Sequence, residues 1–125
     1  MKKIYPLLIT DKLNECADFY VENFGFEKVF EQDWYIQLLH KKSGAELAFM
    51  VPNAENQPKK LHPGFGGKGL VYSFEVENAE KEYNRLKDTG IKIFYDLATE
   101  EWGQKHFMVE GPAGEIVDVV QQLQG

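Results

Sequence analysis

The sequence predicts an α+β fold in which one chain of 125 residues carries two similar modules of the order β-α-β-β-β. The first observation is an internal repeat, because Gly25 recurs as Gly90 and Gly44 recurs as Gly114 in similar surroundings. The second is periodicity: apolar residues recur at helical spacing before each first glycine and alternate with polar residues along the segments expected to be strands. A chain of this length is typical of one compact domain, so we expect the two modules to share a single domain, residues 1–125.

The first module is expected over residues 1–52. An apolar stripe that includes Leu13, Ala17 and Tyr20 predicts a helix, which either Asp11 or Asn14 could cap through a side-chain oxygen. Gly25 is expected to end this helix in the left-handed conformation. The expected strands are residues 4–10, 26–31, 33–41 and 45–51.

The second module is expected over residues 69–125 and repeats this order. Residues 70–76 alternate between apolar and polar faces, with Val71, Ser73 and Glu75 on one of them. Asn78 is expected to cap a helix that ends at Gly90, followed by strands at residues 91–95, 104–110 and 114–121. The connection over residues 53–68 is rich in proline, asparagine and glycine and exceeds the usual maximum of about 12–15 residues for structureless loops, so it is predicted to be a linker or lid.

Composition and charge exclude several classes of function. The net charge is −6 and there is no concentrated basic patch, so we expect no nucleic-acid partner. No apolar run reaches the roughly 18 residues of a membrane span, and the first residues lack the apolar stretch of a signal peptide. Cys16 is the only cysteine, which suits a reducing compartment. We therefore expect a cytoplasmic protein that does not bind membranes.

Several of these features together resemble a known family. The module order, the helix end Phe19-Tyr20 with Phe24-Gly25-Phe26, and the turn Gly111-Pro112-Ala113-Gly114 are similar to the vicinal oxygen chelate superfamily. That superfamily includes glyoxalase I, extradiol dioxygenases, fosfomycin-resistance enzymes and bleomycin-resistance proteins. The segment Trp102–Phe107 resembles the WGQRHF segment of a small subgroup related to glyoxalase and bleomycin resistance. The resemblance implies curled mixed sheets around a cup-shaped cavity, and a homodimer.

The resemblance also locates the positions at which metal-dependent relatives hold their ion. They correspond to Ile4, Glu46, Val71 and Asp118 in this sequence, and the side chains of Ile4 and Val71 have no donor atoms. Because a catalytic metal usually needs about three protein ligands, we expect no metal and no cofactor. A cluster of Glu46, His106 and Asp118 remains as an alternative metal site.

Steps of two along each strand from these positions predict which side chains line the cavity. The repeat, taken from Gly44 and Gly114, aligns His106 with Ile36. The indole of Trp102 is added as a side chain that could stack on a planar ligand or hold a cation, or else pack at a module edge or dimer contact. The predicted ligand-binding residues are Trp34, Ile36, Leu38, Glu46, Met50, Ser73, Glu75, Trp102, Gln104, His106, Met108 and Asp118.

The predicted lining is mostly apolar with a few carboxylates, which suits a small organic ligand that is cationic or aromatic. The leading interpretation is a protein of the bleomycin-resistance type that sequesters such a ligand without metal and without turnover. In one alternative, the chain is a lyase, isomerase or dioxygenase-type enzyme in which His106 acts as general base with Glu46 or Asp118. In another, it is a non-catalytic dimeric interaction module.

Overall fold

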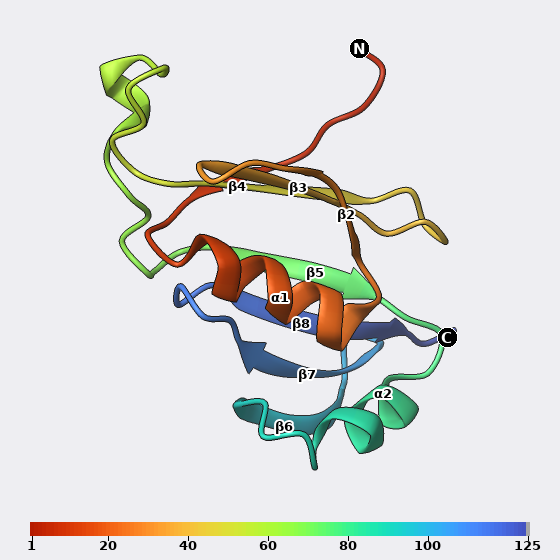
Figure 1. Cartoon of the computed structure of the whole chain (residues 1–125). Coiled ribbons are helices and arrows are strands. Elements are labelled where there is room, and N and C mark those ends of the chain that lie inside the picture. Colours follow the sequence, from red (N-terminus) through yellow and green to blue (C-terminus); the bar gives the residue numbers. More distant parts are fainter. Residues whose placement is uncertain (125) are drawn as a thin grey trace. The chain divides into compact units, whose positions relative to one another are not determined.

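A computed structural model describes residues 1–124 and divides the chain into two compact units (Figure 1). The first unit covers residues 1–66, and the second begins at Gly67. Each unit contains a four-stranded mixed sheet and one α-helix in the order β-α-β-β-β, so the predicted α+β fold is confirmed. Gly125, which the predicted second module includes, lies outside the described residues. None of the helices in residues 1–124 is long and apolar enough to cross a membrane.

The sheet of the first unit has the strand order β1-β4-β3-β2. Strand β1 is parallel to β4, whereas β3 is antiparallel to both β4 and β2. Helix α1 contacts β2, β3 and β4. The elements are β1 (Leu7–Ile9), α1 (Leu13–Phe24), β2 (Glu27–Glu31), β3 (Tyr35–Leu39) and β4 (Glu46–Met50).

Helix α1 ends as the sequence predicts but begins differently. Gly25 has φ 73° and donates its N–H to the carbonyl of Tyr20, which confirms the left-handed end. At the start, the cap position is Lys12, whose N–H donates to the Thr10 hydroxyl at 3.0 Å. The predicted cap at Asp11 or Asn14 is therefore wrong, because the Thr10 side chain takes the local hydrogen bond instead.

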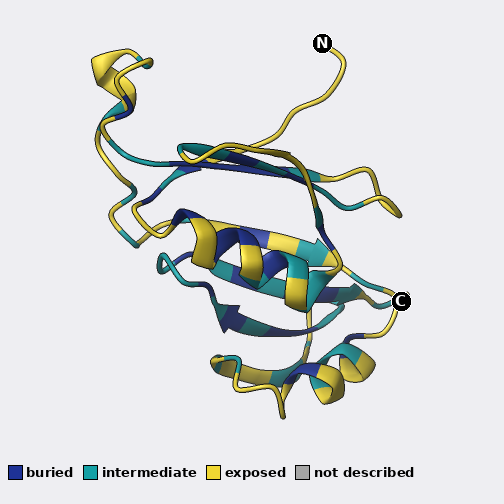
Figure 2. Ribbon diagram, viewed as in Figure 1, coloured by how far each residue is buried: buried dark blue, intermediate teal, exposed yellow. Residues whose placement is uncertain are grey.

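The buried side of α1 packs on the sheet of its own unit through aromatic side chains. Tyr20 is fully buried and stacks on Phe49 of β4 with ring centroids 5.6 Å apart. Figure 2 shows the buried residues of α1 along one side of the helix and exposed residues along the other. This contact identifies the face of β3 and β4 that the helix covers.

The sheet of the second unit has the order β5-β8-β7-β6, with β5 parallel to β8. Its elements are β5 (Val71–Glu75), α2 (Ala79–Leu86), β6 (Ile93–Glu100), β7 (Gln104–Glu110) and β8 (Ile116–Gln122). The Asn78 side chain accepts the N–H of Lys81 at 3.0 Å, which confirms the predicted cap. Helix α2 ends at Leu86, so Gly90 lies in the turn that follows the helix and does not cap it.

The two faces of the second sheet follow the predicted alternation. His106 pairs with Val120, Met108 with Asp118, and Ser73 with Asp118, and directly paired residues share a face. On the opposite face, the Phe107 ring meets the Tyr83 ring of α2 edge-on at 5.3 Å. The face with His106 is therefore the one that α2 does not cover, and we call it the open face of the second sheet.

On β3 the alternation differs from the prediction by one residue. Ile36 pairs with Phe49 and Leu38 with Leu47, so Ile36 and Leu38 lie on the face that α1 covers, and both are 0% exposed. This corrects their assignment to the cavity lining. The open face of the first sheet instead carries Tyr35 and Gln37 from β3, together with the paired β4 residues, including Glu46.

The cause of this difference is the length of the two hairpin connections. Six residues, 40–45, separate the last pair of β3 and β4, whereas five residues, 111–115, separate the last pair of β7 and β8. An alignment of Gly44 with Gly114 therefore matches β4 to β8 correctly but shifts β3 against β7. A shift of one residue exchanges the two faces of a strand. The structural counterpart of His106 is thus Tyr35, and that of Asp118 is Ala48.

The connection between β4 and β5 contains a short 3-10 helix, η1 (Lys59–Leu61), visible in yellow-green in Figure 1. The N–H of Asn53 donates to the carbonyl of His62 at 2.9 Å, and the N–H of Phe65 donates to the carbonyl of Ile9 at 2.7 Å. These hydrogen bonds tie residues 53–65 to one another and to β1. That the connection over residues 53–68 acts as a lid stays a prediction.

Candidate functional site

The open face of the second sheet brings together most of the polar side chains that the sequence singles out in the second module. Ser73 and Glu75 come from β5, Gln104, His106 and Met108 from β7, and Asp118 from β8. Trp102 lies in the turn between β6 and β7 and is 65% exposed. The structure thus gathers residues from three strands and one turn on a single surface.

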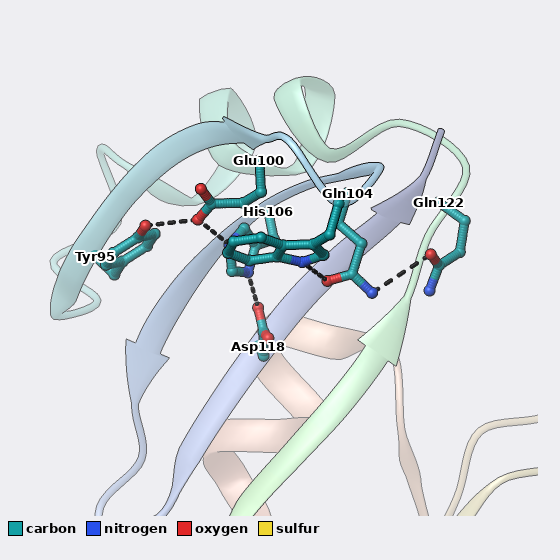
Figure 3. A network of polar contacts seen from close by, with 7 residues as sticks. Tyr95, Glu100, Gln104, His106, Asp118 and Gln122 are labelled. Atoms are coloured by element: carbon teal, nitrogen blue, oxygen red, sulfur yellow. Dashed lines mark hydrogen bonds and ion pairs between the residues drawn. The ribbon is translucent and has the colours of Figure 1, made fainter. Parts of the chain in front are cut away.

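His106 lies at the centre of this surface between two carboxylates (Figure 3). Its Nδ1 is 2.8 Å from Oδ1 of Asp118, and its Nε2 is 2.8 Å from Oε2 of Glu100. The same Glu100 oxygen accepts the Tyr95 hydroxyl at 2.6 Å. His106 itself is only 4% exposed. We call Glu100, His106 and Asp118 the imidazole clamp.

The geometry of the clamp indicates a doubly protonated imidazole. A neutral imidazole has only one N–H, so one of its nitrogens would present a lone pair to a carboxylate oxygen. Burial lowers the pKa of His106, but its hydrogen bonds to Glu100 and Asp118 outweigh burial and raise the pKa above its ordinary value. The pKa of Glu100 is lowered, first by the Tyr95 hydroxyl and then by His106. Both shifts stabilise an imidazolium between two carboxylates.

The aromatic rings around the clamp shield it from water. The Tyr95 ring lies 5.3 Å from the imidazole ring, and the indole of Trp102 meets the imidazole edge-on at 6.5 Å. Hydrogen bonding to Glu100, followed by burial, raises the pKa of Tyr95, so its hydroxyl remains a donor at neutral pH. The imidazole is thus held by ion pairs and enclosed by aromatic side chains.

A second line of hydrogen bonds runs from the indole across the same face. The Trp102 Nε1–H donates to Oε1 of Gln104 at 3.0 Å, and Nε2 of Gln104 donates to Oε1 of Gln122 at 3.4 Å. Nε2 of Gln122 then donates to Oε1 of Glu75 at 3.0 Å. Each amide accepts on one side and donates on the other, so the chain of bonds fixes the orientation of both glutamines and of the indole. It ends on a carboxylate.

Sequence reasoning missed three members of this site: Tyr95, Glu100 and Gln122. Strand β6 extends to Glu100 and not to residue 95, which places Glu100 opposite Gln104 at the end of the β6–β7 hairpin. The register of β6 shifts between Tyr95 and Ala98, and such an irregularity breaks the period of two that reveals a strand. The remaining signal was the short turn before Gln104, which brings the end of β6 beside His106.

The predicted site residues of the first module have different surroundings. Oε1 of Glu46 accepts Nε2 of Gln37 at 2.7 Å, and its Oε2 forms an ion pair with Nζ of Lys3. Met50 pairs with Tyr35 and is buried, and Trp34 directly precedes β3 and is half-buried. The participation of Glu46 in a cluster with His106 and Asp118 stays a prediction.

The imidazole clamp does not have the geometry of a metal site. Its carboxylates lie on opposite ring nitrogens, so the imidazole separates them and the three side chains do not converge on one point. Among residues 1–124, no group of three histidine, cysteine, aspartate or glutamate side chains is arranged to hold a metal ion. What the arrangement presents to a ligand is an acidic surface beside an exposed indole.

Comparison with known proteins gives the family. The model of the Glyoxalase/Bleomycin resistance protein/Dioxygenase superfamily matches residues 4–119. A search of curated proteins finds no match. Among solved structures, a glyoxalase/bleomycin resistance protein/dioxygenase from Nocardioides has a TM-score of 0.80 at 20% identity, over 97% of this chain and 83% of that one.

Two further neighbours are similar in fold over 98% of each chain. One is the bleomycin resistance determinant encoded on the transposon Tn5, with a TM-score of 0.71 at 20% identity. The other is TnmS3, an antibiotic-binding protein from Streptomyces sp. CB03234, with a TM-score of 0.72 at 18% identity. The match of the family model covers most of the sequence, and the protein therefore belongs to the glyoxalase/bleomycin resistance protein/dioxygenase superfamily.

Proposed function

We propose that this protein binds a small organic ligand with an aromatic ring and a positive charge on the open face of its second sheet, and holds it without turnover. The observation that carries the proposal is the imidazole clamp beside an exposed indole. Both nitrogens of His106 are occupied by carboxylates at 2.8 Å. The side chain that would otherwise perform acid–base chemistry thus has a positioning role.

The charge of the surface favours a cation. Glu75, Glu100 and Asp118 supply three carboxylates, and the His106 imidazolium neutralises only one of them. The remaining negative charge lies among aromatic side chains, where fewer water molecules screen it. A cationic ligand would therefore gain more here than on an ordinary solvated surface.

Trp102 supplies the stacking surface. Its Nε1–H is bound to Gln104, which fixes the indole orientation, and the side chain remains 65% exposed. An indole attracts cations over its face and stacks on planar groups. The names of two structural neighbours, an antibiotic-binding protein and a bleomycin resistance determinant, agree with a binding role for this fold.

The enzymatic alternative requires His106 to accept a proton from a substrate. A protonated imidazole with both N–H groups donated to carboxylates has no free lone pair for that step. Opening the clamp would also remove the His106 donor from both Glu100 and Asp118. The geometry therefore supports binding over general-base catalysis.

Ligand binding can be measured by tryptophan fluorescence, because the chain has two tryptophans and Trp102 is the one that belongs to the second unit. In a Trp34→Phe variant, the remaining emission comes from Trp102 alone. We expect cationic aromatic compounds, with bleomycin among the probes, to change this emission saturably, and neutral aromatic compounds of similar size to do so more weakly. The matched Trp102→Phe variant should show no saturable change in the emission of Trp34.

Turnover is tested on the same samples. After long incubation with stoichiometric protein, mass spectrometry should recover a bound ligand unchanged. A product that forms with the wild type but not with His106→Gln would establish the enzyme instead. Absence of saturable binding by any cationic aromatic compound would contradict the proposed function.

We propose further that the protein acts as a metal-free homodimer. Elemental analysis of protein purified without chelators tests the first part, and a stoichiometric transition metal would contradict it. Sedimentation equilibrium tests the second part.

A further inference from the structure

We propose that the open face of the first sheet contains a binding site for a primary alkylammonium group, and that the Lys3 side chain of the same chain occupies this site. The site centres on Glu46 at the start of β4, and the contacts that define it all lie within the first unit. The inference does not rest on the proposed function.

Only one oxygen of the Glu46 carboxylate is held by a residue of the sheet. Its Oε1 accepts Nε2 of Gln37 at 2.7 Å, and Oε1 of Gln37 accepts the Tyr35 hydroxyl at 2.5 Å. All three residues are on strands of the sheet, so this relay is fixed by the register of β3 and β4. The Tyr35 hydroxyl fixes the orientation of the Gln37 amide, so that the NH2 group of the amide faces Glu46.

The other oxygen of Glu46 is bound by a group that does not belong to the sheet. Oε2 forms an ion pair with Nζ of Lys3, whose side chain is 57% exposed, whereas that of Glu46 is only 10% exposed. Residues 1–6 precede β1 and contain neither helix nor strand. A shielded, oriented carboxylate is thus paired with an ammonium group on an exposed and irregular segment.

An aromatic ring, that of Tyr5, also contacts the Lys3 ammonium. Nζ of Lys3 lies 5.7 Å from the centroid of the Tyr5 ring, within the range of a cation–π contact. Burial is the main cause that raises the pKa of Tyr35, and Tyr5 and Glu46 raise it further. Tyr35 therefore stays a neutral donor. The ammonium is held by one carboxylate oxygen and one aromatic face, which are general partners of a primary amine and not of lysine in particular.

An amine from solution must displace Lys3 before it can bind. An exposed ion pair of ordinary strength leaves its acceptor free only a minority of the time, and the apparent affinity of a competitor falls by that fraction. Removal of the Lys3 ammonium should therefore strengthen binding of a free alkylammonium ion by about fivefold.

The test is an NMR titration with n-butylammonium chloride, which reproduces the end of a lysine side chain, at constant ionic strength. The reporter is the side-chain amide of Gln37, because this amide donates directly to Glu46. We compare Lys3→Ala with Lys2→Ala, which removes the neighbouring lysine and the same charge but leaves the Lys3–Glu46 pair in place. Half-saturation should require about fivefold less butylammonium in Lys3→Ala than in Lys2→Ala.

Two controls define the site. A second substitution, Glu46→Gln in the Lys3→Ala background, should abolish the shift of the Gln37 amide. Tetramethylammonium, which carries the charge but has no N–H to donate, should bind at least several-fold more weakly than butylammonium.

Equal half-saturation in Lys3→Ala and Lys2→Ala would overturn the proposal and leave Lys3 as a tether of the first residues only. An equal response to tetramethylammonium, or a response that survives Glu46→Gln, would overturn it as well. The reporter is the Gln37 amide and not an indole, so failure of this test can be told apart from failure of the binding measured by Trp102 fluorescence.

Discussion

Removal of the imidazole tests the clamp most directly, and His106→Leu does so with a side chain of similar size. His106 is 4% exposed and makes hydrogen bonds of 2.8 Å to two carboxylates. A hydrogen bond to a charged group contributes about 1.5–3 kcal/mol, and loss of one partner of a buried pair costs about 3–5 kcal/mol. The carboxylates of Glu100 and Asp118 remain partly accessible to water, with side chains 16% and 15% exposed. We therefore expect a loss near the lower end, about 2–3 kcal/mol in the free energy of unfolding.

The stability lost in His106→Leu should also depend on pH, because the pKa values of His106 and Glu100 are shifted in the folded protein. The pKa of His106 is raised in the folded protein, so its stabilising contribution is fully present below the ordinary histidine pKa of about 6.5. The contribution is lost as the pH rises through the folded value. The pKa of Glu100 is lowered, so its contribution is present above the ordinary pKa of about 4.5 and is lost as the pH falls. The difference between wild type and His106→Leu should thus be largest near about pH 6 and smaller near about pH 9.

The assay is urea unfolding followed by Trp102 fluorescence in the Trp34→Phe background at both pH values. His106→Gln is the matched variant, because one amide can donate to one carboxylate but not to both, and its loss should be intermediate. A loss below about 1 kcal/mol for His106→Leu at the lower pH, or a difference that grows with pH, would refute the clamp as described.

Two further predictions concern the scaffold of each unit. Asn78→Ala removes the side chain that accepts the N–H of Lys81 and should lower the free energy of unfolding by about 1 kcal/mol, whereas Asn78→Asp should keep most of the stability. An equal loss in both variants, measured by urea unfolding, would contradict the cap. Phe49→Ala removes the ring that stacks on Tyr20 at a fully buried position and should lower the free energy of unfolding by about 3–5 kcal/mol, which calorimetry would detect as a lower melting temperature. A loss below about 1 kcal/mol would show that the contact with α1 is not part of the core.

Local signals in the sequence were enough to predict the type and order of the elements of both units, although not all of their ends. Gly25 ends α1 because a left-handed residue is needed there, and Asn78 begins α2 because its side chain replaces a missing backbone acceptor. These signals depend on neighbours within a few residues. The order of the elements along the chain and the α+β class follow from them.

The composition of the site depended on features that local signals do not contain. The faces of β7 were predicted correctly because its connection to β8 matches the expected turn, so His106 and Asp118 were placed on one face. The face of β3 was predicted incorrectly because the connection from β3 to β4 is one residue longer than the connection from β7 to β8. Glu100 was missed because the irregular register of β6 hides its alternation. Errors of this kind arise from pairing between strands, which a single sequence does not show.

The different lengths of the β3–β4 and β7–β8 connections also decide at which positions the His106–Asp118 pair could be introduced into the first unit. A design based on the alignment of Gly44 with Gly114 would replace Ile36 by histidine, and the imidazole would then lie under α1 among apolar side chains. A graft designed from the strand pairs would place histidine at position 35 and aspartate at position 48, on the face of the sheet that α1 does not cover. One residue in the hairpin connection thus decides whether the new histidine would lie under α1 or on the opposite face of the sheet, beside the new aspartate.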